Sequence, residues 1–234
     1  MSQETPTGTG VVIGGTSGLG REIATRMAER GLSVVITGRD AERSARIAAE
    51  IGPGVRGIAL DLAQPETIAA ALADLDSVDQ LVIAAIERDA NGVKAYDVAG
   101  ATRLAVLKLV GYTEVVHVLH ERLSPGASVV LFGGLAMMRP YPGSTTVTTV
   151  NGGISAMVRT LASELAPVRV NALHPGIVGD SPEWADKNLE MVVARTPIGR
   201  TVTMAEIVDA TFFLLENGGV NGVNLMVDGG TLVR

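Results

Sequence analysis

Gly14, Gly18 and Gly20 have a spacing that lets a backbone turn approach a phosphate group. Residues 11–13 are apolar and β-branched, which predicts a short buried strand, and the residues after Gly20 have helical periodicity. Glycine brings backbone N–H groups close to a phosphate because it has no Cβ, and the positive end of the following helix attracts an anion. The pattern is Gly-x3-Gly-x-Gly instead of the commoner Gly-x-Gly-x-x-Gly. The turn by itself is therefore also compatible with a βα connection that binds nothing.

Arg39 indicates which dinucleotide this turn would serve. The second predicted strand ends in Thr37-Gly38-Arg39, at the place where a carboxylate would hold the ribose hydroxyls of NAD. An arginine there offers a planar cation that suits a phosphate, and Gly38 is expected to leave room for it. The prediction is NADP(H) in preference to NAD(H). Asp61 and Leu62, at the end of the third predicted strand, are expected beside the adenine, with a turn or N-cap aspartate as the alternative for Asp61.

Apolar runs that alternate with helical segments provide the frame for these residues. The runs are rich in Val and Ile on both faces, as buried parallel strands are. Strands are predicted near 10–14, 33–37, 55–60, 80–85, 127–132, 168–173 and 223–227, and helices over 18–30, 40–51, 65–74, 97–123 (with a break near Gly111), 149–165 and 204–216. We therefore predict one α/β domain over residues 1–234, a doubly wound parallel sheet (Rossmann fold) of about seven strands with helices on both faces. The stretch 177–203 interrupts the alternation and is expected to form a lid or substrate loop, or else a surface loop without a ligand role.

The composition argues against several classes of protein. The chain has 234 residues and a formal net charge of −6, which disfavours nucleic acid as a partner because phosphate neutralisation requires clustered Lys and Arg. It has no cysteine, so disulfides and thiolate chemistry are excluded. No apolar stretch approaches the ~20 residues of a membrane helix, and residues 1–10 lack an export signal, so we expect no membrane partner and a cytoplasmic location. His117, His120 and Glu121 share a helical face, but no further ligand converges on them in the sequence, and no metal site is predicted.

Further motifs resemble those of the short-chain dehydrogenase/reductase family over nearly the whole chain. They are Gly14-Gly-Thr-Ser-Gly-Leu-Gly20, Thr37-Gly-Arg39, Asp61-Leu62, Leu161-Ala-Ser-Glu-Leu-Ala166, Arg169-Val-Asn-Ala-Leu-His-Pro-Gly176, Thr196-Pro-Ile-Gly-Arg200 and Asn221-Gly-Val-Asn-Leu-Met-Val-Asp-Gly-Gly230. By this resemblance Pro175, Gly176 and Ile177 lie beside the nicotinamide ring. The cofactor contacts predicted from the motifs together are Gly14, Thr16, Ser17, Gly18, Leu19, Gly20, Arg39, Asp61, Leu62, Ala84, Ala85, Asn151, Pro175, Gly176 and Ile177.

The same resemblance fails at the positions that carry catalysis in this family. Family members use a Tyr-x-x-x-Lys pair on the helix after the fifth strand, and counting back from the Leu-Ala-Ser-Glu-Leu motif places Val147 and Asn151 there. The family serine corresponds to Gly133 or Gly134, and the family asparagine to Lys108. Valine has no proton to transfer and glycine has no side chain to polarise a carbonyl. The standard mechanism therefore cannot operate, and the catalytic residues are unknown from the sequence, although Asn151 is still able to hydrogen-bond a ribose.

Few other side chains offer a substitute for the missing proton donor. Tyr141 is a weak candidate that borders the expected pocket, and packing between its two flanking prolines is the preferred interpretation. Lys108 is expected to be a solvated helix lysine, with lowering of a neighbouring pKa or binding of a substrate carboxylate as the alternatives. His174 is expected to pack at the end of its strand. Thr148 or Thr149 is expected to be the N-cap of the following helix.

Two functions from different classes remain open. The first is an NADP(H)-dependent oxidoreductase that reduces a small hydrophobic carbonyl or enone with a non-standard proton source. Its expected pocket walls are Ile86, Met137, Met138, Val147 and Trp184. The second is a catalytically dead family member that acts as an NADP(H)-binding sensor or scaffold, and a non-redox isomerase or cyclase is a third possibility. We favour an enzyme, because hydride transfer chiefly needs close, aligned reactants.

The resemblance also implies a homodimer or homotetramer that pairs through helices 97–123 and 149–165. Gly152, Gly153 and Ala156 would give the second helix a small-residue surface that permits close packing. The alternative is that this surface packs against the chain's own sheet.

Overall fold

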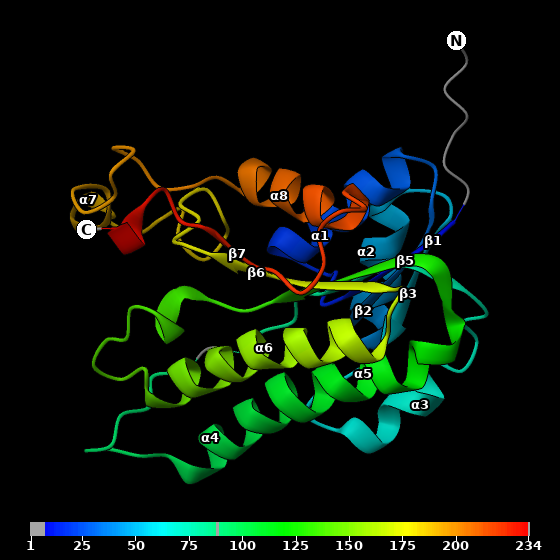
Figure 1. The fold of residues 1–234 in the computed structure, drawn as a ribbon, viewed down its shortest axis with the longest axis horizontal. Helices are drawn as coiled ribbons and strands as arrows, with labels where there is room; N and C mark the ends of the chain where they lie inside the picture. Colours follow the sequence, from blue (N-terminus) through cyan, green and yellow to red (C-terminus); the bar gives the residue numbers. More distant parts are fainter. Residues whose placement is uncertain (1–7, 88, 234) are drawn as a thin grey trace.

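A parallel sheet of seven strands forms the centre of the computed structural model, which describes residues 8–87 and 89–233 (Figure 1). The strands are β1 (Thr9–Ile13), β2 (Ser33–Gly38), β3 (Val55–Ala59), β4 (Val78–Ile83), β5 (Leu123–Phe132), β6 (Arg169–Pro175) and β7 (Asn224–Val227). Their order is β3-β2-β1-β4-β5-β6-β7, so the chain changes direction across the sheet between β1 and β4. In doubly wound sheets a ligand binds beside the carboxyl ends of the strands at such a point. The predicted fold class is confirmed.

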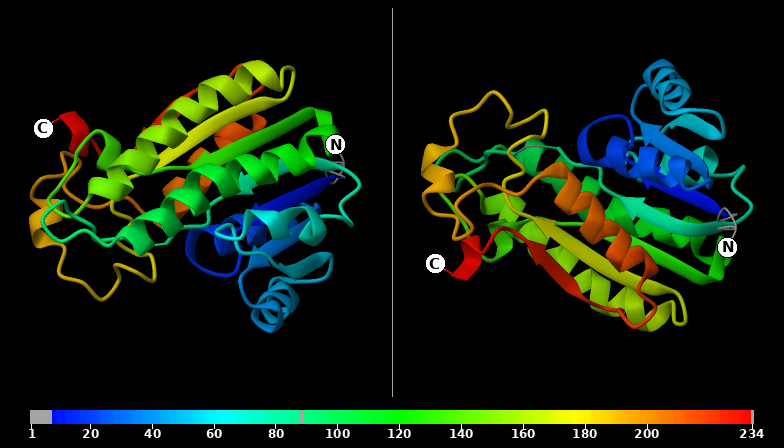
Figure 2. Two further views of the ribbon diagram at one scale, coloured as in Figure 1. Left: turned by 90° about the horizontal axis from the view of Figure 1, so that it is seen from below. Right: turned by 90° about the horizontal axis from the view of Figure 1, so that it is seen from above.

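Helices cover both faces of this sheet (Figures 1 and 2). One face carries α1 (Gly18–Glu29), α2 (Ala41–Ile51) and α8 (Met204–Glu216), and the other carries α3 (Ile68–Ala71), α4 (Val98–Ala105), α5 (Tyr112–Leu119) and α6 (Thr145–Glu164). Strand β5 shows why both layers are needed. Val129 and Leu131 pack into the α4–α6 layer, whereas Val130 packs into the α1–α8 layer, as expected for a parallel strand that is buried on both faces.

The long helix predicted over 97–123 does not break at Gly111. A π-helical turn (Val106–Gly111) joins α4 to α5, and a 3-10 turn (His120–Arg122) ends the element. A Cβ on Gly111 would lie 2.3 Å from the carbonyl oxygen of Leu62. Glycine at this position therefore permits close packing of the helix against the chain after β3, and the expected break was wrong.

Helix α6 begins earlier than predicted. Ser144 is its N-cap residue, and the Ser144 hydroxyl accepts a hydrogen bond from the Tyr141 N–H at 2.9 Å and pairs with the Thr148 hydroxyl at 2.9 Å. Thr148 and Thr149 lie inside the helix, where the Thr149 hydroxyl donates to the carbonyl of Thr145. The N-cap expected at these threonines was wrong. The predicted helix 65–74 is also shorter, because a 3-10 turn (Pro65–Thr67) precedes the four residues of α3.

The chain between β6 and α8 contains little regular structure. Its helix α7 (Glu190–Val193) is one turn long, and Val178 pairs with Val202 in an isolated parallel bridge. Figure 2 shows this segment projecting from the same end of the sheet as the connection between β5 and α6, which contains a 3-10 turn (Leu135–Met137). Both segments lie at the carboxyl ends of the strands.

No helix within residues 8–87 and 89–233 has the length and apolar character needed to cross a membrane. Of the N-terminal stretch considered for an export signal, residues 1–7 lie outside the described residues. On α5 and the turn after it, the rings of His117 and His120 stack with centroids 5.7 Å apart. In the described part of the chain, no three His, Asp or Glu side chains converge in a way that could hold a metal ion.

Candidate active site

A cleft of about 1280 Å³ opens at the carboxyl ends of the central strands. The residues predicted as cofactor contacts all line it, from the turn after β1 to Pro175, Gly176 and Ile177 after β6. The four positions that the resemblance assigns to catalysis also meet there, as Lys108, Gly134, Val147 and Asn151. The fold thus brings residues from the whole length of the sequence to one site.

The turn between β1 and α1 exposes the start of a helix to this cleft. Gly20 packs so tightly that a Cβ would lie 2.2 Å from the carbonyl oxygen of Gly14. Gly18 has a φ of +50°, and a Cβ there would meet no atom within 4 Å. The N-cap residue Ser17 makes no side-chain hydrogen bond to the helix, so the first N–H groups of α1 remain available. Such a helix start is suited to a phosphate.

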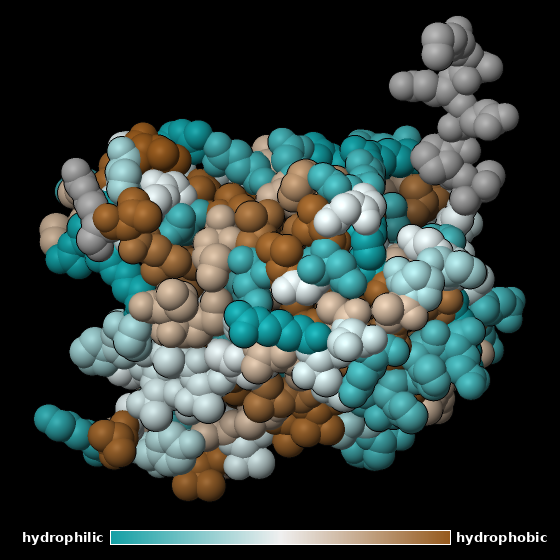
Figure 3. Space-filling view, viewed as in Figure 1, coloured by the Kyte–Doolittle hydropathy of each residue, from teal (hydrophilic) through white to brown (hydrophobic). Residues whose placement is uncertain are grey.

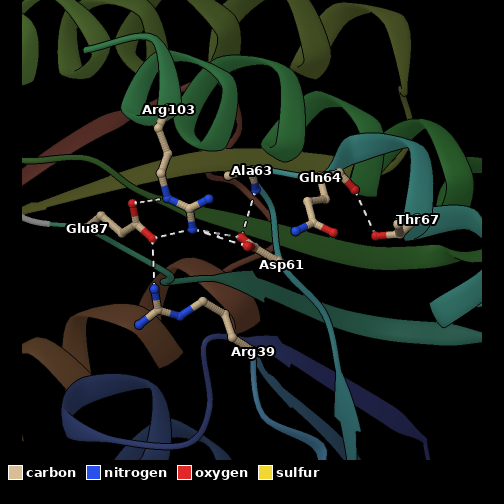
Figure 4. Close-up of polar contacts among 7 residues, drawn as sticks. All are labelled: Arg39, Asp61, Ala63, Gln64, Thr67, Glu87 and Arg103. Atoms are coloured by element: carbon tan, nitrogen blue, oxygen red, sulfur yellow. Dashed lines mark hydrogen bonds and ion pairs between the residues drawn. The ribbon is translucent and has the colours of Figure 1, made fainter. Parts of the chain in front are cut away.

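Arg39 belongs to a chain of ion pairs at one end of the cleft (Figure 4). Its guanidinium lies 3.0 Å from a carboxylate oxygen of Glu87, and Glu87 is also held by Arg103 at 2.6 Å. Arg103 reaches on to Asp61 at 3.1 Å, and Asp61 accepts a hydrogen bond from the N–H of Ala63 at 3.0 Å. Asp61 is therefore a turn aspartate and an ion-pair partner in this structure, and its contact with adenine stays a prediction.

Gly38 is packed against two neighbouring side chains of the protein itself. A Cβ on Gly38 would lie 2.7 Å from Thr16 and 2.9 Å from the hydroxyl of Ser44, so the protein's own packing requires glycine here. Gly38 also lines the cleft, and the room it is expected to leave for a phosphate stays a prediction. Arg39 itself remains open, with a side chain that is 68% exposed. Arg43, one helical turn further on, lines the same part of the cleft and forms no ion pair within the described residues. The cationic end of the cleft therefore contains a second arginine.

Asn151 and His174 fill the space next to the two glycines after β5. A Cβ on Gly134 would lie 2.9 Å from the amide nitrogen of Asn151, and one on Gly133 would lie 2.3 Å from the Nδ1 atom of His174. The Asn151 side chain is buried and makes no hydrogen bond within the described residues. Asn151 lines the cleft, so its amide is free to hydrogen-bond a molecule bound there.

His174 is buried and neutral in this arrangement. Burial lowers its pKa, because desolvation penalises the charged imidazolium. The N–H of Gly134 donates to its Nδ1 atom at 3.1 Å, which places the proton on Nε2, and Nε2 donates to the Asn224 side chain at 2.9 Å. The Asn224 amide continues to the carbonyl of Ser155 at 3.1 Å. His174 thus ties β6 to β7 and α6, as expected for a packing role at the end of its strand.

Lys108 is not the solvated lysine that the sequence suggested. It is 1% exposed, and its ammonium donates to the hydroxyl of Tyr112 at 2.6 Å and to the carbonyl of Phe132 at 2.8 Å. Tyr112 donates in turn to the carbonyl of Ala85 at 2.8 Å. Burial lowers the pKa of Lys108 to about 7 and raises the pKa of Tyr112, since both shifts avoid a buried charge. Sequence reasoning missed Tyr112; the four-residue spacing between Lys108 and Tyr112 on one helical face is the signal that would have found it.

The comparisons with known proteins agree with this geometry. A family model described as enoyl-(acyl carrier protein) reductase matches residues 13–231. A solved structure described as a short chain dehydrogenase/reductase family protein has a TM-score of 0.87 at 34% identity, with 97% of each chain covered. The chain belongs to the short-chain dehydrogenase/reductase family.

Two further short-chain dehydrogenase/reductase relatives span nearly the whole chain. Carbonyl reductase family member 4 of Danio rerio is 30% identical over 229 residues, which cover 94% of this chain and 96% of that protein. A structure described as a putative betaketoacyl-ACP reductase is 33% identical with a TM-score of 0.88, and 99% of this chain and 100% of that chain are covered. The family resemblance seen in the sequence is confirmed, and the chain is an oxidoreductase by family.

The apolar end of the short-chain dehydrogenase/reductase cleft differs in part from the expected walls. Ile86, Val147 and Trp184 line it, whereas Met137 and Met138 do not. Tyr141 also lines the cleft but is 56% exposed, so the expected packing between its flanking prolines is not observed. The segment after β6 contributes several side chains to the same wall, namely Ser181, Pro182, Glu183, Trp184, Met191, Val192, Arg195, Thr196, Thr201 and Val202.

Proposed function

We propose that this chain is an NADP(H)-dependent reductase that acts on a small hydrophobic carbonyl compound or enone. The observation that supports this most is the continuity of the cleft, which runs from the phosphate-suited turn and Arg39 to the apolar side chains of Ile86, Val147 and Trp184. Pockets for single small molecules usually span about 300–1,000 Å³, so a cleft of about 1280 Å³ has room for a dinucleotide together with a second molecule.

The residues of the cleft fit the successive parts of a phosphorylated dinucleotide. The free N–H groups at Gly18 suit the pyrophosphate, and the exposed guanidinium of Arg39, with Arg43 beside it, suits a 2′-phosphate. The unpartnered amide of Asn151 suits a ribose hydroxyl. When bound, the reduced nicotinamide supplies a hydride. The chain would hold that ring beside Pro175–Ile177 and align a substrate against it, and alignment of this kind is worth ~7–11 kcal/mol.

The names of the relatives favour a carbonyl group as the site of reduction, because the Danio rerio relative is named a carbonyl reductase and one solved relative a putative betaketoacyl-ACP reductase. We infer that catalysis differs from the family pattern, since Val147 and Gly134 stand where the resemblance places the tyrosine and the serine. Loss of a positioned acid typically removes ~10²–10⁴-fold in rate, so another proton source is part of the proposal.

A binding and turnover experiment tests this function directly. Trp184 is the single tryptophan of the chain and lines the cleft, so quenching of its fluorescence reports dinucleotide binding. We expect tighter binding of NADPH than of NADH, and NADPH oxidation with hydrophobic ketones, enones, quinones or β-ketoacyl thioesters. Oxidation no faster than in buffer across the whole panel would contradict the proposal.

A catalytically dead NADP(H) sensor is the second candidate. Its support is the absence of Tyr, Ser and Lys from the positions matched to the catalytic residues. It predicts tight NADPH binding without hydride transfer. Loss of deuterium from [4-²H]NADPH in the presence of a carbonyl substrate, with label found in the product, would eliminate it.

We also propose a homodimer or homotetramer that pairs through α4–α5 and α6. Val98 and Val110 are 67% and 51% exposed on the first of these elements, and Figure 3 shows apolar surface on this face of the molecule. Gly152 opens onto free space, whereas a Cβ on Gly153 would meet Leu109 of the same chain at 2.5 Å, so Gly153 serves internal packing and only part of the small-residue surface is free. Light scattering on the purified chain measures the assembly. A lid role for 177–203 and a cytoplasmic location stay predictions.

A further inference from the structure

Lys108 occupies the boundary between the protein interior and the cleft. Lys108 is among the residues that line the cleft, and its ammonium lies at the Phe132 carbonyl at the end of β5. Tyr112 lies behind it in the core and fixes the ammonium from that side at 2.6 Å. Tyr112 does not line the cleft, so Lys108 is the member of the pair that is available to a bound molecule.

The hydrogen bonds of Lys108 leave one donor free. A lysine ammonium has three N–H donors, and two of them are used by the Tyr112 hydroxyl and the Phe132 carbonyl. No carboxylate within the described residues pairs with Lys108. A buried ammonium without a counter-charge readily gives up its proton. Because Lys108 lines the cleft, its third donor is the one available to a molecule bound there.

The positions that supply the proton in other family members offer no donor that would compete with Lys108. Gly133 and Gly134 contribute no side chain, and the space next to them is taken by His174 and Asn151. Val147 has no transferable proton. Lys108 lines the cleft near the end of β5 and has an ammonium proton to give. Tyr112 keeps its phenolic proton, but it does not line the cleft and donates to the carbonyl of Ala85, while His174 does not line the cleft and is held neutral by burial.

We propose that Lys108 is the general acid of this enzyme and delivers the proton to the substrate oxygen. This inference rests on the proposed carbonyl reduction and names the proton source that the proposal requires. The carbonyl carbon gains a hydride, with its electron pair, from the reduced nicotinamide, and the π electrons of the carbonyl move to oxygen. The oxygen takes a proton from the Lys108 ammonium, which becomes a neutral amine. The products are an alcohol and the oxidised dinucleotide, and solvent returns the proton to Lys108.

The test compares Lys108→Met with wild type and with Lys94→Met, which removes an exposed lysine. We expect Lys108→Met to bind NADPH within about threefold of wild type, as read by Trp184 quenching, and to reduce the carbonyl substrate at least ~10²-fold more slowly. Lys94→Met should match wild type in both measurements. Addition of methylammonium to Lys108→Ala should restore part of the lost rate.

The pH profile separates proton donation from a packing role. Because the protonated lysine is the active form, kcat/KM of wild type should fall as pH rises above about 7, the pKa of buried Lys108. Tyr112 and His174 are the titratable groups that face Lys108. Burial shifts the pKa of Tyr112 upwards and that of His174 downwards, so neither group should cause the fall in kcat/KM above pH 7. The residual kcat/KM of Lys108→Met should not show this fall above pH 7.

A measurement that does not depend on turnover is available because the sequence contains only three lysines, at 94, 108 and 187. In protein labelled with [¹³Cε]lysine, the resonance missing from Lys108→Met should titrate near neutral pH, and it should shift when NADP⁺ is added.

Several results would overturn the inference. An unchanged rate or an unchanged pH profile in Lys108→Met, while wild type turns over, would contradict the role of Lys108 and leave the proposed reductase function standing. Loss of the rate in Tyr141→Phe, with Lys108→Met active, would assign the proton to Tyr141. A wild type that binds NADPH but transfers no hydride would overturn the proposed function and this inference together.

Discussion

Lys108, Tyr112 and His174 place three titratable side chains in the interior beside the cleft. Each is 1% exposed or less, and burial moves the pKa of each toward its neutral form. Lys108 is the one whose shifted pKa, about 7, falls close to neutral pH. The charge of the cleft floor therefore depends on pH mainly through a single residue.

This burial has a measurable effect on stability. Between pH 7 and the ordinary lysine pKa of 10.5, unfolded Lys108 is protonated and folded Lys108 is not, so the unfolded state binds more protons and the free energy of unfolding rises with pH. We expect Lys108→Met to be more stable than wild type at pH 7, with a difference that shrinks toward pH 10. Urea unfolding at several pH values measures it. A constant difference would show that Lys108 keeps an ordinary pKa in the folded chain.

The predicted preference for NADPH over NADH depends on Arg39. Hydrogen bonds to charged groups contribute about 1.5–3 kcal/mol, so Arg39→Ala should weaken NADPH binding about 10- to 100-fold and leave NADH binding nearly unchanged. Trp184 quenching provides the dissociation constants. Arg46→Ala is the matched control, because Arg46 pairs with Glu50 at 3.3 Å and does not line the cleft. An equal loss for both dinucleotides would remove Arg39 from the 2′-phosphate site.

At the scale of elements, the π-helical turn Val106–Gly111 directs Lys108 inward. One extra residue in a turn rotates the side chains relative to an α-helix, and here it brings Lys108 to the carbonyl of Phe132 while Val110 remains 51% exposed. Gly111, the last residue of this turn, packs closely against the backbone of Leu62. The position of Lys108 therefore depends on how closely this helix approaches the chain after β3.

Two glycine substitutions with opposite expected effects on the free energy of unfolding test this dependence. Gly111→Ala would set a Cβ 2.3 Å from a backbone oxygen, so we expect a loss of about 1–3 kcal/mol and a lower catalytic rate. Gly152→Ala meets no atom within 4 Å and should gain about 0.5–1 kcal/mol through helix propensity. Thermal unfolding gives both values, at about 2–4 °C per kcal/mol for a chain of this size. A neutral Gly111→Ala would show that the helix can move away without consequence.

At the scale of the whole molecule, the cleft joins the two halves of the sheet. Its lining runs from Ile13 at the end of β1 to Thr231 after β7, and each half contributes strand ends to it. A ligand that spans the cleft contacts both halves of the sheet. Its binding to the folded state therefore raises the free energy of unfolding of the entire chain.

We therefore expect NADPH to raise the melting temperature. A ligand at 100 times its dissociation constant contributes about 2.7 kcal/mol, which corresponds to roughly 5–11 °C. NADH at the same concentration should raise it less, and Arg39→Ala should remove most of the difference between the two. Scanning calorimetry provides the measurement, and an absence of any shift with either dinucleotide would contradict cofactor binding.

The sequence by itself determined the order of strands and helices and the location of the cofactor cleft. These follow from local patterns: apolar runs buried on both faces, and the glycines from Gly14 to Gly20 that a strand–turn–helix connection needs. It also identified the family, because the motifs from Asp61 to Gly230 keep their places relative to the strands.

Only the tertiary structure decided how individual side chains are used. Gly38 is packed against Thr16 and Ser44, Asp61 is paired with Arg103, and Lys108 is buried against Tyr112 and Phe132. These outcomes depend on contacts between distant parts of the chain, such as Arg103–Asp61, 42 residues apart, and Lys108–Phe132, 24 residues apart. The position of Lys108 also depends on the π-helical turn. Desolvation of Lys108 arises from the packing of the π-helical turn against the end of β5, which no local pattern of residues reveals.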